Sequence, residues 1–175
     1  MIKYPRKGVF IMPKPRKKDA LIDEMIRAYA RCESPSTVYA PGSLATADDC
    51  ALVEELFSVV GTIVRVGEDM ISPVTALSGS GPAYFCLLTE KLAEAAEDFG
   101  MDKKTADALA LSTLIGTAKL LSDGDVTPEE LRRRVTSKKG TTEAGVDAML
   151  ASGFAKAVAD GFNAARIRSD ELSKG

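Results

Sequence analysis

One uncharged stretch constrains the fold of this chain most. Residues 103–122 have the pattern of a helix capped by Asp102, and its segment "ALALSTLIGTA" (108–118) carries no charge. A helix without a polar side is buried on all sides, and a domain the size of residues 70–175 cannot easily surround it. The small residues that would let partner helices approach closely are Ala110, Ser112, Gly116 and Ala118. We therefore expect an intertwined homodimer in which a second copy supplies the missing wall.

The remainder of residues 70–175 is predicted to be all-α. Pro82 marks the first turn of a helix that runs to Gly100, a residue suited to the C′ position. Thr127 and Glu130 form a capping-box pattern that opens a short helix to about Val135. Two further helices are predicted, one from residue 141 ended by Gly153 and one over residues 154–172.

The first part of the chain has a different predicted secondary structure. Residues 34–69 predict a β-α-β unit, with strands over 36–42 and 62–67 and a helix that begins after Thr46 and reaches Gly61. Residues 1–33 form a basic N-terminal segment with one helix, 19–31, capped by Asp19. The expected fold class is therefore mainly α, with a small α/β remnant before an interleaving helical dimerisation domain.

Charge and residue usage exclude several function classes. Residues 1–18 contain seven basic and no acidic residues, and the remaining 16 basic and 25 acidic residues leave a net charge of −9, which disfavours nucleic acid. The absence of histidine excludes Ser-His and Cys-His nucleophile pairs and most zinc sites, so we expect no metal. The three scattered cysteines and the lack of a long apolar run predict a reduced, cytoplasmic protein without a membrane span.

Two stretches could bind a ligand. In "TALSGSGPAYF" (75–85), Ser80 could simply cap a helix that Pro82 starts, or Gly79 and Gly81 could let a ligand touch the backbone at the positive end of that helix. A lone Gly-x-Gly is not a dinucleotide fingerprint.

The second stretch is "VTSKKGTTEAG" (135–145). Thr141 or Thr142 could be an N-cap, but a Gly-Thr-Thr helix start also presents free N–H groups and two hydroxyls to a carboxylate or phosphate. Five cations accompany it, and they form either a solvated face or a rim that attracts anions. They are Arg132, Arg133, Arg134, Lys138 and Lys139.

Three motifs in register resemble one family. "VTALSGSGPAYFCLLTEKLAEAA", "GMDKKTADALALSTLIGTAKLL" and "TPEELRRRVTSKKGTTEAGVDAMLASGF" look like the C-terminal helical domain of pyrroline-5-carboxylate reductase. The similarity extends from about Ser34 to the C-terminus. It implies helices that interleave with a second subunit, a dimer that can assemble into rings, and NAD(P)H-dependent reduction of 1-pyrroline-5-carboxylate to proline in the intact family.

The resemblance also implies roles for individual residues. The loop Val135–Thr142, with Ser137, Gly140 and Thr141, would bind the substrate carboxylate, and Thr142 would bond the ring nitrogen. Asp125 matches an acid that precedes the helix entering this loop. The turn over Ser78, Gly79, Ser80, Gly81 and Pro82 would lie near the nicotinamide end of the cofactor.

Two departures from the family pattern qualify the expected function. The chain has no Gly-x-Gly-x-x-Gly, and Lys138-Lys139-Gly140 stands where the family usually has Pro-Gly-Gly. We therefore expect a truncated or split reductase, which could work with a separate Rossmann-bearing chain. The alternative is a non-catalytic dimeric module that binds proline-like carboxylates or partners a full-length reductase. A third hypothesis is that the basic N-terminus docks a nucleotide or another protein.

Overall fold

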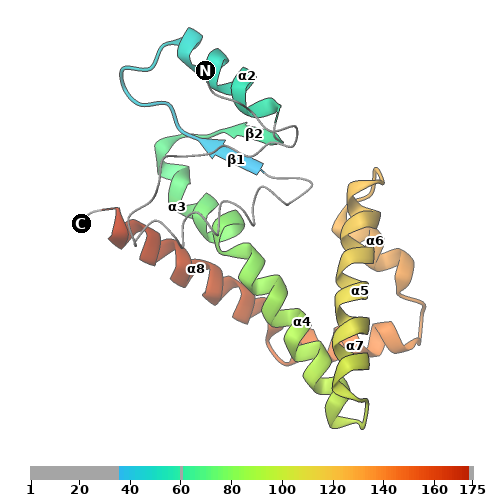
Figure 1. Cartoon of the computed structure of the whole chain (residues 1–175). Helices are drawn as coiled ribbons and strands as arrows, with labels where there is room; N and C mark the ends of the chain where they lie inside the picture. The colour runs from blue at the N-terminus through green and yellow to red at the C-terminus, as the bar shows by residue number, and fades with distance from the viewer. Residues whose placement is uncertain (1–35, 60, 174–175) are drawn as a thin grey trace. The chain divides into compact units, whose positions relative to one another are not determined.

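The computed structural model describes residues 36–59 and 61–173. The predicted helix over 19–31 and the basic segment 1–18 therefore lie outside the described residues. The chain divides into two units, residues 1–71 and 72–175, and each has its own architecture. The first contains a parallel strand pair and the second is helical (Figure 1).

The described part of the first unit is a β-α-β unit, as predicted. Strand β1 (Ser36–Tyr39) pairs in parallel with β2 (Thr62–Arg65), and helix α2 (Ala47–Ser58) forms the crossover. Thr46 and Asp49 form a complete capping box at the start of α2. The helix ends at Ser58, three residues before the predicted Gly61, because the chain must turn into β2.

The hydroxyl of Tyr39 joins the strand pair to this helix. It donates a hydrogen bond of 2.5 Å to the Glu54 carboxylate, which raises the pKa of Tyr39 to about 12. Cys50, also on α2, is the buried residue of this unit among those the structure describes. Strand, helix and side-chain hydrogen bond thus hold the unit together with very little buried apolar surface.

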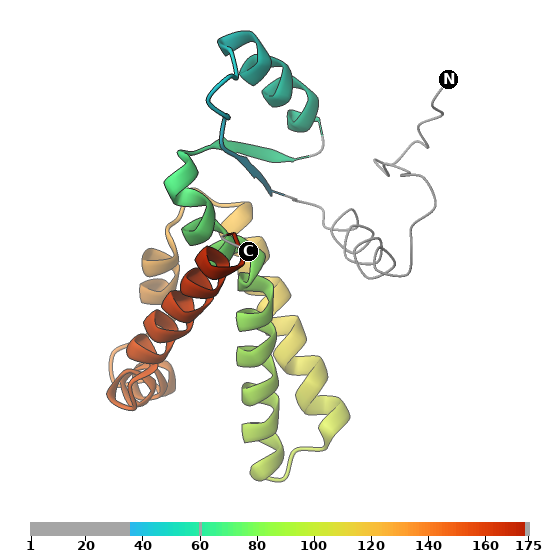
Figure 2. The ribbon, with the colours of Figure 1, turned by 90° about the vertical axis from the view of Figure 1, so that its left-hand side faces the viewer.

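The second unit is all-α over its described residues. The turn η1 (Glu68–Met70) of the first unit and α3 (Ile71–Val74) lead into the π-helical turn η2 (Thr75–Gly79), which contacts the last helix, α8 (Phe154–Leu172). Helices α4 (Gly81–Asp98) and α5 (Lys103–Ser122) pack side by side as an antiparallel hairpin (Figures 1 and 2). The remaining two helices are α6 (Pro128–Val135) and α7 (Thr141–Ala151).

Most of the predicted helix ends are confirmed. Asp102 caps α5 by accepting a hydrogen bond of 3.1 Å from the Thr105 amide, and Gly100 ends the preceding helix with φ +92°. The capping box predicted for α6 is only half formed. Thr127 accepts from the Glu130 amide at 3.1 Å, but the Glu130 carboxylate pairs with Arg134 at 2.6 Å instead of returning to Thr127.

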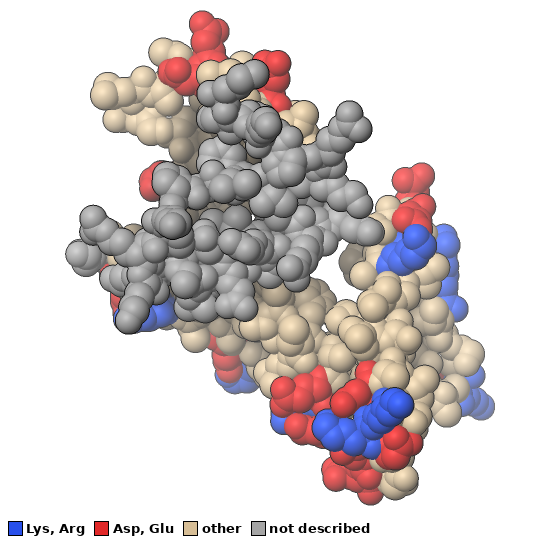
Figure 3. Space-filling model, in the orientation of Figure 1, with Lys and Arg blue, Asp and Glu red and all other residues tan. Residues whose placement is uncertain are grey.

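The hairpin of α4 and α5 is poorly covered by the single chain. Among the described residues of the second unit, those that are buried are small: Gly81, Ala76, Ala93 and Ala106. On α5, Leu111 and Ile115 are 52% and 58% exposed, so the single chain leaves this helix partly uncovered, as the sequence predicts. Figure 3 shows uncharged residues over the middle of α5 and charged residues at the tip of the hairpin.

Candidate functional site

A tight turn between α6 and α7 carries most of the predicted site residues. Helix α6 ends because Thr136 is extended, and its hydroxyl donates to the Arg132 carbonyl at 2.7 Å. The Gly140 amide then donates to the Ser137 carbonyl at 2.9 Å, which closes a turn over residues 137–140. Ser137, Gly140, Thr141 and Thr142 are thereby brought together.

The start of α7 presents unused hydrogen-bond donors. Gly140 is the N-cap with an extended backbone, so Thr141 and Thr142 are the first two helical residues and neither is the cap. The amides of residues 141–143 precede the first intrahelical bond, in which Ala144 donates to the Gly140 carbonyl at 3.2 Å. Both threonine hydroxyls are exposed, and within the described part of the chain they have no hydrogen-bond partner. This is a cluster of donors at the positive end of a helix.

Cations surround this turn. Arg134 is paired with Glu130, whereas the side chains of Arg132, Arg133, Lys138 and Lys139 form no ion pair with any residue that the structure describes. The turn and the end of α6 therefore carry positive charge that a carboxylate or phosphate would meet.

Glu143 is a residue of this turn that the sequence analysis missed. It is the third residue of α7, and its carboxylate accepts a hydrogen bond of 2.6 Å from the Lys139 amide. A Glu three residues after an N-cap is the spacing of a capping box, so that spacing after Gly140 could have identified it.

Two predicted residues lie away from Thr142. Asp125 is exposed in the connection between α5 and α6, and α6 separates it from the turn by eight residues, about 12 Å of helix. Val135, at the end of α6, lines a groove of about 300 Å³ shared with Leu120 and Leu121 of α5. Among the described residues, Asp125 and Thr142 share no hydrogen bond.

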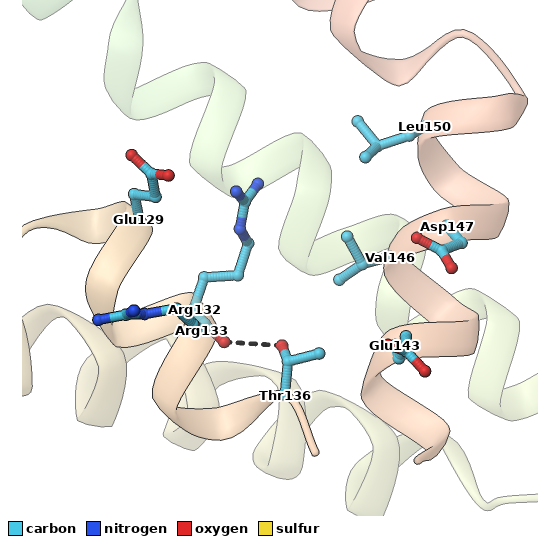
Figure 4. Close-up of a pocket in the computed structure, with 8 residues that line it drawn as sticks. All are labelled: Glu129, Arg132, Arg133, Thr136, Glu143, Val146, Asp147 and Leu150. Atoms are coloured by element: carbon cyan, nitrogen blue, oxygen red, sulfur yellow. Dashed lines mark hydrogen bonds between the residues drawn. The ribbon is translucent and has the colours of Figure 1, made fainter. Parts of the chain in front are cut away.

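A second groove, of about 410 Å³, lies between α6 and α7 beside the turn. Arg132, Arg133 and Thr136 line it from α6, and Val146 and Leu150 line it from α7 (Figure 4). Glu143 lies at the same end of this groove as Thr136, which places the groove next to the turn. Thr136 of the predicted loop 135–142 and the predicted cations Arg132 and Arg133 thus line this groove, whereas Ser137, Gly140, Thr141 and Thr142 do not.

The turn Ser78–Pro82 differs from its predicted form. Ser80 makes no side-chain cap to α4, so its predicted capping role is wrong. The chain is already helical from Ile71, and the Ser80 amide donates to the Thr75 carbonyl at 2.9 Å across the π-helical turn. The turn therefore has fewer free donors than a new helix start would, although such π turns are frequent at functional sites.

The described residues show no metal cluster and no membrane-spanning helix. Over 36–59 and 61–173, no three His, Cys, Asp or Glu side chains are grouped to hold a metal ion. No described helix is long and apolar enough to cross a membrane. Cys50 and Cys86 are free thiols.

Comparison with known proteins identifies the family. Residues 68–172 match the family model described as pyrroline-5-carboxylate reductase dimerisation. The chain belongs to the pyrroline-5-carboxylate reductase family. A relative with that name from Pseudomonas aeruginosa is 41% identical over 143 residues, which cover 81% of this chain and 52% of the relative. The chain spans about half the length of the curated relatives it matches.

Solved structures of pyrroline-5-carboxylate reductases have the same fold. The enzyme from Coxiella burnetii matches with a TM-score of 0.75 and 33% identity, covering 82% of this chain and 54% of that one. The Plasmodium falciparum enzyme, solved with NADP bound, matches with a TM-score of 0.70 and 25% identity, covering 82% and 55%. The predicted mainly helical fold with a small parallel strand pair is confirmed.

Proposed function

We propose that residues 70–175 supply the dimerisation and substrate-binding part of a reductase that converts 1-pyrroline-5-carboxylate to L-proline with NAD(P)H. The observation that carries this function is the turn 137–140 ahead of α7, which lies inside the family match and gathers free amides, hydroxyls and cations. Those groups suit a small carboxylate.

Each residue of the turn has a proposed task. The amides at the start of α7 and the Ser137 hydroxyl hold the substrate carboxylate, and the Thr142 hydroxyl bonds the ring nitrogen. Lys138 and Lys139 add positive charge that attracts the acid. Holding the acid and the ring nitrogen together orients the C=N carbon for reduction. Asp125 is the proposed acid of the site, and it precedes α6 whereas the turn follows that helix.

The sequence of the 175 residues contains no recognisable site for the hydride donor. NAD(P)H supplies the hydride when it is bound, but the 175 residues contain no Gly-x-Gly-x-x-Gly, and the described residues offer no glycine-rich turn after a strand. We propose that a separate Rossmann-bearing chain binds the dinucleotide and that Ser78–Pro82 approaches its nicotinamide end. The NADP-bound relative from Plasmodium falciparum supports the choice of cofactor class.

A homodimer, which could assemble further into a ring, is the proposed form of the protein. Ala108, Ser112 and Gly116 recur every four residues on α5, so they share a face that admits a close helix, and no heavy atom lies within 4 Å of a Cβ built at Gly116. Exposed Leu111 and Ile115 adjoin that face. A reducing compartment such as the cytoplasm suits the free Cys50 and Cys86.

Binding of L-proline tests the substrate site. We expect proline to raise the melting temperature of the chain, Thr142→Ala to abolish that shift, and Thr142→Ser, which retains the hydroxyl, to preserve most of it. A melting temperature that proline leaves unchanged would refute the substrate site.

Turnover separates the proposed function from its alternative. The alternative is a non-catalytic module that binds proline-like acids. We expect no NAD(P)H oxidation by the chain alone, and oxidation with 1-pyrroline-5-carboxylate once a Rossmann-bearing chain is added. Proline binding without turnover in that mixture would favour the module.

A further inference from the structure

The turn before α7 contains a lysine in a conformation that favours glycine. Lys139 has φ +60°, and it is the one non-glycine residue with positive φ among those described. The Cβ atom of an L-residue crowds the backbone in this region, so glycine or asparagine normally occupies it. Something nearby must therefore keep Lys139 in place.

Glu143 makes the contact that does so. Its carboxylate accepts the hydrogen bond of 2.6 Å from the Lys139 amide, so the first turn of α7 is tied back to the residue before its own cap. The acceptor is a carboxylate at the positive end of a helix, where negative charge is favoured. The bond also occupies the Lys139 amide, which leaves the donors on residues 141–143 to face a ligand.

Gly140 and Ser137 restrict the same turn from the other side. A Cβ atom at Gly140 would collide with the Ser137 hydroxyl oxygen and would lie 2.9 Å from the Ser137 carbonyl oxygen. The Ser137 side chain is thus packed directly against the residue that caps α7. A change in the Lys139 backbone would move Ser137 and the threonines with it.

We infer that Glu143 is a positioning residue for the substrate turn. It holds Lys139 in the left-handed conformation and so keeps the Ser137 hydroxyl and the α7 amides directed at one ligand. This role rests on the proposed function for the identity of that ligand. Glu143 is needed for this role because residue 139 is a lysine, which does not adopt the left-handed conformation as readily as glycine would.

Four variants of the full chain test this role, with L-proline as the probe in calorimetry. We expect Glu143→Ala to weaken proline binding about tenfold, or about 1.4 kcal/mol. Glu143→Gln keeps an oxygen acceptor and should stay within about threefold of the parent chain. The double variant Glu143→Ala with Lys139→Gly should return to within about threefold of Lys139→Gly alone, because glycine adopts the turn without a brace. If Glu143→Ala weakened proline binding only by destabilising α7, the added Lys139→Gly would not restore the affinity.

Amide hydrogen exchange of Lys139 provides an independent readout. Exchange should become at least about tenfold faster in Glu143→Ala. The matched control is Asp147→Ala, an exposed acid one turn further along α7, which should change neither exchange nor affinity. Parent-like exchange and affinity in Glu143→Ala, or a double variant that stays as weak as Glu143→Ala, would overturn the positioning role.

The two hypotheses fail in different ways. If the parent chain does not bind proline, the proposed function fails and the positioning role fails with it. If the parent binds proline but the Lys139 amide exchanges at the same rate with and without Glu143, only the positioning role fails.

Discussion

Replacing Ile115 by serine tests whether a second copy covers α5. The side chain is 58% exposed in the single chain, in the middle of the uncharged stretch. Complete burial of an isoleucine side chain contributes about 1.5–3 kcal/mol, so covering the exposed part would contribute about 1–1.5 kcal/mol per copy. A symmetric dimer contains the residue twice, which gives about 2–3 kcal/mol, or roughly a 30- to 150-fold weaker dimer after substitution.

Sedimentation equilibrium over a dilution series measures this change as a shift in the dimer dissociation constant. The matched control is Leu44→Ser, which removes an apolar side chain that is 93% exposed but lies between β1 and α2, outside the hairpin. We expect the control to leave the dissociation constant unchanged. A parent chain that is monomeric, or an Ile115→Ser dimer as tight as the parent dimer, would refute the reasoning.

Three further substitutions test the local structure. Lys139→Gly should stabilise the chain relative to Lys138→Gly by about 1–2 kcal/mol in chemical denaturation, because only Lys139 has positive φ; equal effects would count against a strained turn. Ala106→Leu should destabilise the chain by about 1–3 kcal/mol in the same assay, because Ala106 is only 2% exposed on α5, which packs against α4; a neutral effect would mean that the packing around Ala106 is loose. Hydrogen bonds from Thr105 hold the pKa of Asp102 below its ordinary value of 3.8. The contribution of the ionised Asp102 to the stability of the chain is therefore present above that pH and is lost as the pH falls through the lowered pKa. In melts followed by circular dichroism between about pH 5 and 2, the melting temperature of Asp102→Asn should fall less with acid than that of the parent chain.

Much of the candidate site was predictable because it depends on local sequence. Gly-Thr-Thr after a run of cations marks a helix start with free donors, and the structure has that start at Thr141. Glu143 was missed, although its spacing from Gly140 is a local signal. Ser80 was misassigned as a cap because the π-helical turn before it, which occupies the Ser80 amide, involves residues without any helix-start pattern.

The sequence by itself determined the strand pair and most of the helices with their ends. Caps such as Asp102 and Thr46 act within one turn of chain, and hydrophobic periodicity is local, so both can be seen without coordinates. Only the tertiary structure decided that Lys139 is left-handed and that Glu143 ties it to α7. These features depend on which surfaces meet in space, and neither residue type nor local spacing specifies that.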